Sequence, residues 1–178
     1  MIKRIQLLAL LFLCNLSFAQ DAKLESNLLA FNLSANPVSV YNEFRLTNHT
    51  SIKAELGFGL RIDSEESVEK SWGIEPKAAL EYRLYYNLNS RSKNGKRVDF
   101  NSGNYFSFLT NYIFPEIIGK NKKNYFSFSF GPTYGLRRAI GKKTVFEGAI
   151  GYLIPSEKSA NNGDMQEVFI KIGFDFVL

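Results

Sequence analysis

The segment at residues 51–62, SIKAELGFGLRI, alternates apolar and polar positions along its length. Its even positions are apolar from Ile52 to Ile62, whereas its odd positions from Lys53 to Arg61 are charged or glycine. Because successive side chains of a strand point to opposite faces, the segment predicts a strand with one apolar and one charged face. A soluble sheet turns its apolar face inward, but a membrane-spanning barrel turns that face outward.

The alternation recurs along the chain and predicts eight strands, with no convincing helical period between them. The strands are expected at about residues 24–34, 37–47, 51–62, 71–87, 104–115, 124–138, 144–155 and 166–178. The connecting segments have the composition of turns, including EIIGKNKK and the unusually long NLNSRSKNGKRVDFNSG. Ordinary strands centre on about 5 to 6 residues. Longer strands such as these match the about 9 to 11 residues that a tilted strand needs to cross a bilayer.

The polar face of these strands mixes charges of both signs with glycine. Its charged members are Glu43, Arg45, Lys53, Glu55, Arg61, Glu75, Lys77, Glu81, Arg83, Arg137, Glu147, Lys171 and Asp175, and its glycines are 57, 59, 131, 135, 151 and 173. The interior of an eight-stranded barrel barely admits side chains, so long charged residues need small neighbours and partners of opposite charge. A strand face in water has no reason to favour glycine. The mixture therefore predicts that the polar face lines a filled lumen.

The apolar face is rich in aromatic residues. Phenylalanines 106, 108, 126, 128, 130, 146, 174 and 176 suit a lipid-facing belt, and Trp72, Tyr82, Tyr86, Tyr112, Tyr134 and Tyr152 suit its interfacial borders. A secreted soluble barrel or sandwich with these residues as its core is the alternative, but it explains neither strand length nor glycines. The predicted fold is all-β: a closed antiparallel up-and-down transmembrane β-barrel of eight strands, since an open edge in lipid leaves backbone groups unpaired. An even number of strands returns the chain to its starting side, so the second, fourth and sixth turns are expected in the periplasm.

The N-terminus has the composition of a cleavable secretion signal. Lys3 and Arg4 precede an apolar run to Cys14, which is too short for a spanning helix of about 20 residues. Small side chains at Ser17 and Ala19 favour cleavage after Ala19. We therefore expect residues 1–19 to be a cleaved signal peptide and residues 20–178 to be the outer-membrane β-barrel domain. Cleavage removes the only cysteine, so packing and hydrogen bonds alone must hold the barrel together.

Charge and composition exclude several kinds of partner. The formal net charge of +5 is scattered, and its basic clusters fall in expected turns, which argues against nucleic acid as a partner. One histidine and no cysteine after cleavage predict no metal centre, and the sequence calls for no cofactor. The acidic loop at residues 63–70, DSEESVEK, could collect a cation, but a solvated loop is the favoured interpretation.

The chain combines the signal ending in Ala19-Gln20, the alternating strands, EPKAALEYRLYYNLNSRSKNGK followed by NSGNYFSF, and the terminal FIKIGFDFVL. In this combination it resembles the small outer-membrane β-barrel proteins of flavobacteria. The resemblance implies a monomeric, Gram-negative outer-membrane protein in contact with outer-membrane lipids and lipopolysaccharide. It also implies that the barrel-insertion machinery reads the C-terminal strand, whose usual final aromatic residue is replaced here by Leu178 with Phe176 two positions earlier.

The expected function is that of a structural or binding scaffold with a side-chain-filled lumen, and not that of an enzyme. No catalytic, cofactor-binding or metal-binding residue is expected. A lipid-modifying outer-membrane enzyme is an alternative that needs His49 near the outer leaflet, yet His49 falls in a short turn expected on the periplasmic side. A narrow channel or ligand carrier is another alternative, and it needs a lumen left partly unfilled.

Overall fold

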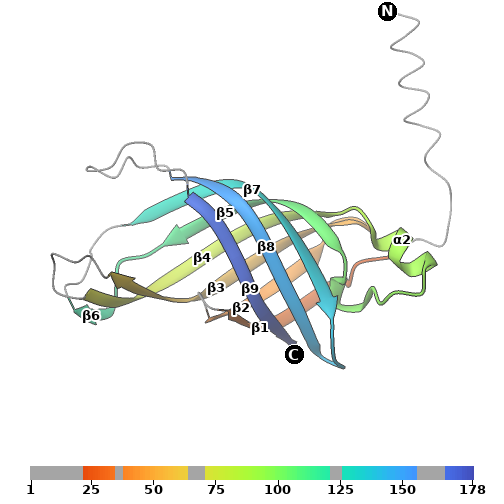
Figure 1. Ribbon diagram of the computed structural model, residues 1–178, viewed down its shortest axis with the longest axis horizontal. Helices are drawn as coiled ribbons and strands as arrows, with labels where there is room; N and C mark the ends of the chain where they lie inside the picture. Colours follow the sequence, from red (N-terminus) through yellow and green to blue (C-terminus); the bar gives the residue numbers. More distant parts are fainter. Residues whose placement is uncertain (1–21, 35–37, 64–70, 121–125, 156–166) are drawn as a thin grey trace, which may run out of the picture.

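The computed structural model describes residues 22–34, 38–63, 71–120, 126–155 and 167–178 (Figure 1). Its strands are β1 (Asn27–Ser34), β2 (Val38–Arg45), β3 (Thr50–Asp63), β4 (Ser71–Tyr85), β5 (Asn104–Ile113), β6 (Ile118–Lys120), β7 (Ser127–Ala139), β8 (Thr144–Pro155) and β9 (Glu167–Val177). Two short helical segments, α2 (Leu88–Lys93) and η1 (Asp99–Asn101), join β4 to β5. The eight predicted strands are confirmed, with ends that differ by at most three residues. The predicted signal peptide, and the acidic loop beyond residue 63, lie outside the described residues.

The eight long strands form a closed, antiparallel, up-and-down β-barrel, as predicted. Apart from β6, each strand pairs with the next one along the chain, and β9 returns to pair with β1. That closing register runs from Ala30 opposite Val177 to Ser34 opposite Gly173. Closure gives every long strand a partner on both sides and removes the free edges of an open sheet.

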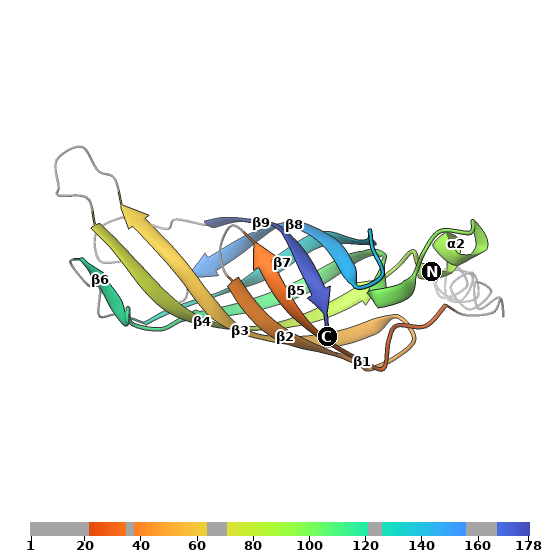
Figure 2. The same cartoon turned by 90° about the horizontal axis from the view of Figure 1, so that it is seen from below.

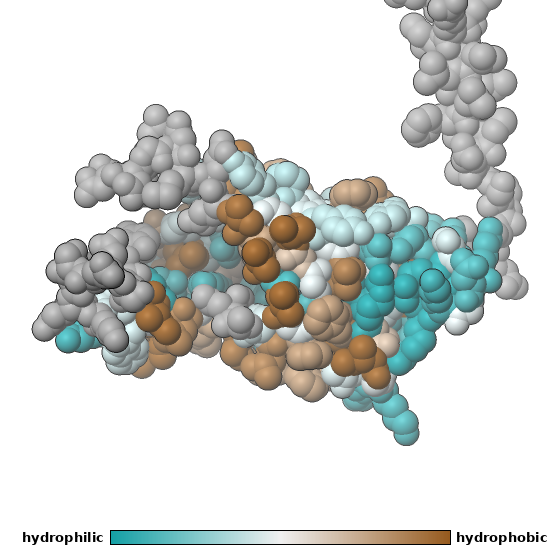
Figure 3. All heavy atoms as spheres, in the orientation of Figure 1, coloured by the Kyte–Doolittle hydropathy of each residue, from teal (hydrophilic) through white to brown (hydrophobic). Residues whose placement is uncertain are grey.

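The alternation along each strand sorts side chains by polarity across the barrel wall. On β2 and β3, Glu43 and Lys53 are 0% and 1% exposed, while Leu56 is 69% exposed. On the face drawn in Figure 3, apolar side chains likewise gather over the middle of the barrel, and hydrophilic ones gather over the end that carries α2. The polar face is therefore the interior of the barrel, and the apolar face is its exterior.

The two ends of the barrel are built differently (Figure 1, Figure 2). We call them the β6 end and the α2 end. At the β6 end, β3 and β4 are 14 and 15 residues long and continue past β5. There β6 pairs with β4, with Trp72 opposite Lys120 and Ile74 opposite Ile118. The prediction that this connection forms only a turn was wrong for residues 118–120, because the edge of β4 left open beyond β5 recruits them as a strand.

The connection between β4 and β5 at the α2 end was predicted as a long turn, and it is locally helical. Asn104 N donates to the Asn87 side chain (2.8 Å) and Arg91 N donates to Asn87 O (2.9 Å), so Asn87 ties the start of α2 to the start of β5. No helix in the described part of the chain is long and apolar enough to cross a membrane.

Candidate functional site

Two buried arginines organise the interior of the barrel. Arg83 Nη2 lies 2.6 Å from both Glu81 Oε2 and Glu147 Oε1. Arg137 Nη1 donates to Glu43 Oε2 (2.8 Å), and its Nη2 lies 3.0 Å from Asp175 Oδ2. The two guanidiniums share Glu43, since Arg83 Nη1 is 3.5 Å from the same oxygen. Charged side chains from β2, β4, β7, β8 and β9 thus meet in one continuous network across the lumen.

Three buried tyrosines complete this network, and the sequence analysis did not identify them. Tyr41 donates to Asp175 Oδ2 (2.9 Å), Tyr85 to Glu43 Oε1 (2.9 Å) and Tyr105 to Glu147 Oε1 (2.6 Å). The Arg83 guanidinium also lies over the Tyr105 ring, 4.3 Å from its centroid. Their inward position was readable from the alternation, because Tyr41 shares a face with Glu43, and Tyr85 with Arg83.

Two lysines form the next layer of the interior toward the β6 end. Lys53 Nζ donates to Glu55 Oε2 (2.6 Å), and Lys171 Nζ lies 3.3 Å from the same oxygen. Both ammonium groups are 3.9 Å from Glu147 Oε2, which links this layer to the arginine network. Ser39 Oγ also donates to Glu55. The carboxylates are thus surrounded by cations and hydroxyls, as buried charge requires.

Twelve of the thirteen charged residues predicted for the lumen lie on the inner face, buried or half-buried. Arg45 is the exception, and its prediction was wrong. It is the last residue of β2 and is exposed at the α2 end, where its Nη1 donates to Leu24 O (2.8 Å). The alternation shows which side of the barrel wall a side chain faces, but it does not show where along a strand the buried interior ends.

Glycines occupy inner positions that are too crowded for a side chain. A Cβ placed on Gly57 would lie 2.5 Å from both Ser39 Cβ and Val38 O. A Cβ on Gly135 would enter the ring of Tyr105. Gly135 therefore makes room for a long polar side chain, as the sequence predicted, whereas Gly57 lets the backbone of β2 approach closely.

An apolar plug closes the α2 end of the barrel. Leu24 and Leu88 pack on Tyr85 and Tyr105 and are at most 2% exposed. Phe100 packs on Leu28, Ala30 and Tyr41 beside it. These contacts hold Phe100 in the left-handed region, at φ 52°, which is strained for a bulky residue. The plug and the charged network together fill this half of the lumen.

The lumen toward the β6 end keeps a cavity of about 300 Å³. Its charged lining includes Glu55, Lys77 and Lys171, and its apolar lining includes Leu109 and Leu153. Beyond it, the inner face of the β3–β4–β6 extension carries Arg61, which bonds to Ser71 Oγ (2.8 Å) and pairs with Glu116. Glu116 follows β5 in a loop, so no strand pattern could have revealed it.

His49 lies in the turn between β2 and β3 at the α2 end. Its N donates to Thr47 Oγ1 (3.2 Å) and its O accepts from Tyr85 N (2.8 Å), so both backbone groups of His49 hold this turn in place. Among the described residues, no group of three or more histidine, cysteine, aspartate or glutamate side chains is placed to hold a metal ion.

The fold and its lining define the chain as a closed eight-stranded β-barrel with a charged interior and an apolar exterior. Comparisons with protein-family models, with curated proteins and with solved structures find no match.

Proposed function

We propose that this protein is an integral outer-membrane β-barrel that serves as a structural and binding scaffold and has no catalytic activity. The observation that carries the proposal is the inverted polarity of the wall, with charge inside and apolar side chains outside. Leu56, Val168 and Ile170 are 69%, 65% and 63% exposed. Monomeric soluble proteins rarely expose large contiguous apolar surface, whereas a lipid-facing band requires it.

Strand length and closure support the same placement. Six of the eight long strands have 10 residues or more, and a tilted strand needs about 9 to 11 to cross the hydrocarbon layer; β1 and β2 have 8. The backbone hydrogen bonds of the long strands close into a ring, which a sheet in lipid requires. In this proposal the α2 end faces the periplasm, the exterior contacts outer-membrane lipids and lipopolysaccharide, and β9 is the strand read by the insertion machinery.

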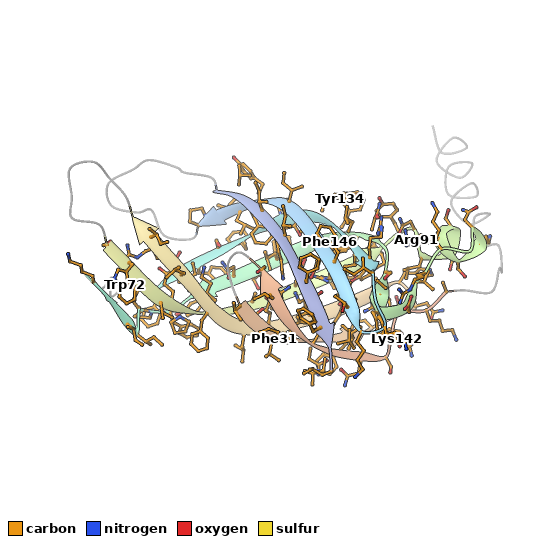
Figure 4. All side chains as sticks on the ribbon, turned by 60° about the horizontal axis from the view of Figure 1, so that its bottom comes forward. Phe31, Trp72, Arg91, Tyr134, Lys142 and Phe146 are labelled. Carbon is orange, nitrogen blue, oxygen red and sulfur yellow. The ribbon has the colours of Figure 1, made fainter. Side chains whose placement is uncertain are left out.

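Gel mobility and solubility test the membrane placement. The protein, unfolded in urea and refolded into detergent micelles, should migrate faster before boiling than after it, because a closed barrel stays compact in detergent. Emission of Trp72, the only tryptophan, should be quenched by brominated lipid after refolding into vesicles, since this side chain is 44% exposed on the outer face (Figure 4). A monodisperse barrel in detergent-free buffer, with unquenched Trp72, would refute the placement.

The filled half of the lumen indicates that the barrel does not conduct ions. The arginine network and the apolar plug both lie across any path toward the α2 end. Purified protein in planar bilayers is therefore expected to give no stable current steps. Large unitary conductance from the pure protein would contradict a filled lumen.

The cavity of about 300 Å³ favours a ligand carrier as a second candidate function. It has the size of a small binding site, combines charged and apolar walls, and is blocked on one side by the network. Native mass spectrometry of the purified barrel should then reveal a small bound molecule that is lost in Leu109→Trp, a change that fills the cavity. Identical spectra for both proteins would eliminate this candidate.

A further inference from the structure

Two tyrosines and an asparagine form a hydrogen-bonded group on the outer wall near the α2 end. The hydroxyls of Tyr86 and Tyr134 lie 3.0 Å apart, and Asn104 Nδ2 donates to each of them at 3.0 Å. The Phe106 ring packs between the two tyrosines, with centroid distances of 5.4 and 5.3 Å. The hydroxyls are thus held at fixed positions on the outside of the barrel.

Two arginines lie beside these tyrosines. Arg138 Nη2 donates to Asn104 Oδ1, and its Nη1 donates to Gly103 O (3.1 Å). Arg91 Nε donates to Ser102 O (3.0 Å), so the two guanidiniums are anchored on carbonyls of consecutive residues. A cation pair fixed in this way provides a site for an anion.

Within the described part of the chain, neither Arg91 nor Arg138 forms an ion pair with a carboxylate. Arg97 at the same end is different, because it pairs with Asp99 and lowers the pKa of that carboxyl through their hydrogen bond. The hydrogen bonds of Arg138 to Gly103 O, Arg137 O and Asn104 Oδ1 use three of its five N–H donors. Two donors remain for a ligand.

The position of this group on the barrel indicates which kind of anion it would bind. It lies where the apolar exterior meets the hydrophilic α2 end; Tyr134 stands out from the wall and Arg91 lies at that end (Figure 4). Phe106 and Phe108, next in line toward the middle of the barrel, are 56% and 50% exposed. A ligand there meets fixed cations and hydroxyls at one end and an apolar wall along the rest of its length.

We propose that Tyr86, Arg91, Asn104, Tyr134 and Arg138 form a binding site for the phosphate of a membrane glycerophospholipid, with the acyl chains along Phe106 and Phe108. A phosphodiester carries one negative charge and two free oxygens, which suit two guanidinium groups and the one tyrosine hydroxyl whose proton is not used in the Tyr86–Tyr134 hydrogen bond. The inference rests on the proposed membrane insertion, in which the α2 end meets the phospholipid leaflet.

Native mass spectrometry of the refolded, delipidated barrel tests the site. Phosphatidylglycerol should bind, whereas diacylglycerol with the same acyl chains should not, because it lacks the phosphate. Loss of charge-assisted hydrogen bonds in Arg138→Gln should weaken phosphatidylglycerol binding about tenfold. Lys142→Gln is the matched control, since it removes one exposed charge from the same end and should bind normally.

Each other outcome overturns the site. Equal binding of diacylglycerol would show that only the acyl chains are bound. Equal weakening of phosphatidylglycerol binding in Lys142→Gln would show non-specific electrostatic attraction of the lipid to this end of the barrel. Displacement by equimolar inorganic phosphate would show a free-anion site. If Arg138→Gln does not fold, Arg91→Gln and the double variant Tyr86→Phe with Tyr134→Phe provide the same test. Failure to show the heat-dependent gel shift would defeat the membrane placement itself, whereas a shifting barrel without lipid discrimination would defeat only this site.

Discussion

Arg137 is the residue at which the cost of breaking the interior network should be largest. It is 0% exposed and contacts Glu43 at 2.8 Å and Asp175 at 3.0 Å. At an effective dielectric constant of about 20, attraction at the latter separation is about 5.5 kcal/mol. Arg137→Met removes both pairs. Glu43 keeps Arg83 nearby, but Asp175 loses the ion pair that the structure gives it.

We expect Arg137→Met to lower the free energy of unfolding by about 3 to 5 kcal/mol, the range for a buried pair that loses one partner. Adding Asp175→Asn should recover about 1 kcal/mol or more of the unfolding free energy, because it neutralises the carboxylate that has lost its ion pair with Arg137. The amide oxygen of asparagine can still accept the hydrogen bond from Tyr41. Urea titrations of the barrel in vesicles, followed by Trp72 emission, measure both changes.

The control and the refuting result are specific. Arg97→Met removes an exposed arginine whose pair with Asp99 is open to solvent, so its unfolding midpoint should stay close to that of the parent. If Arg137→Met unfolds at the parental urea concentration, or if Asp175→Asn only adds further loss, the network does not stabilise the barrel as described.

Three further outcomes are expected. Gly57→Ala should destabilise the barrel by about 1 to 3 kcal/mol in urea titrations, because its Cβ would lie 2.5 Å from a backbone oxygen. Gly148→Ala should have almost no effect, because the nearest atom to its Cβ would be 3.7 Å away. Equal effects of the two variants would contradict a crowded lumen. A nitroxide at Phe58, which is 55% exposed, should be relaxed by a lipid-dissolved reagent, and shielding from it would place the apolar face inside. Leu88→Ala should cost about 2 to 5 kcal/mol in unfolding free energy because it leaves a void in the plug, and a parental value would show that the plug packs loosely.

Much of the fold was readable because its strands carry a strict alternation. A period of two fixes which side chains share a face, so it gave both the strands and the inner positions of Glu43, Lys53 and Arg83. The choice between inside and outside came from composition, since charges beside glycines suit only a narrow interior. The same composition predicted that the inner charges form buried ion pairs, but not which cation pairs with which carboxylate.

The parts that escaped prediction depend on contacts between distant segments. Which cation meets which carboxylate is set by barrel shear and diameter, so the contact of Arg137 with Asp175 could not be derived from spacing. Glu116 and β6 take their positions from the uncovered edge of β4. Tyr41 was missed for another reason: aromatic residues were expected on the lipid side, although the alternation placed this one inward.

The pairing of β1 with β9 also governs when this protein can fold. Ala30 and its partner Val177 are 147 positions apart, so the first strand gains its second neighbour only from the last strand of the chain. Until β9 is present, β1 lacks one neighbour and no partial chain can complete the ring. A truncated chain that lacks β9 would keep two free edges, and it should appear in cells as an aggregate or a protease substrate, not as a smaller barrel.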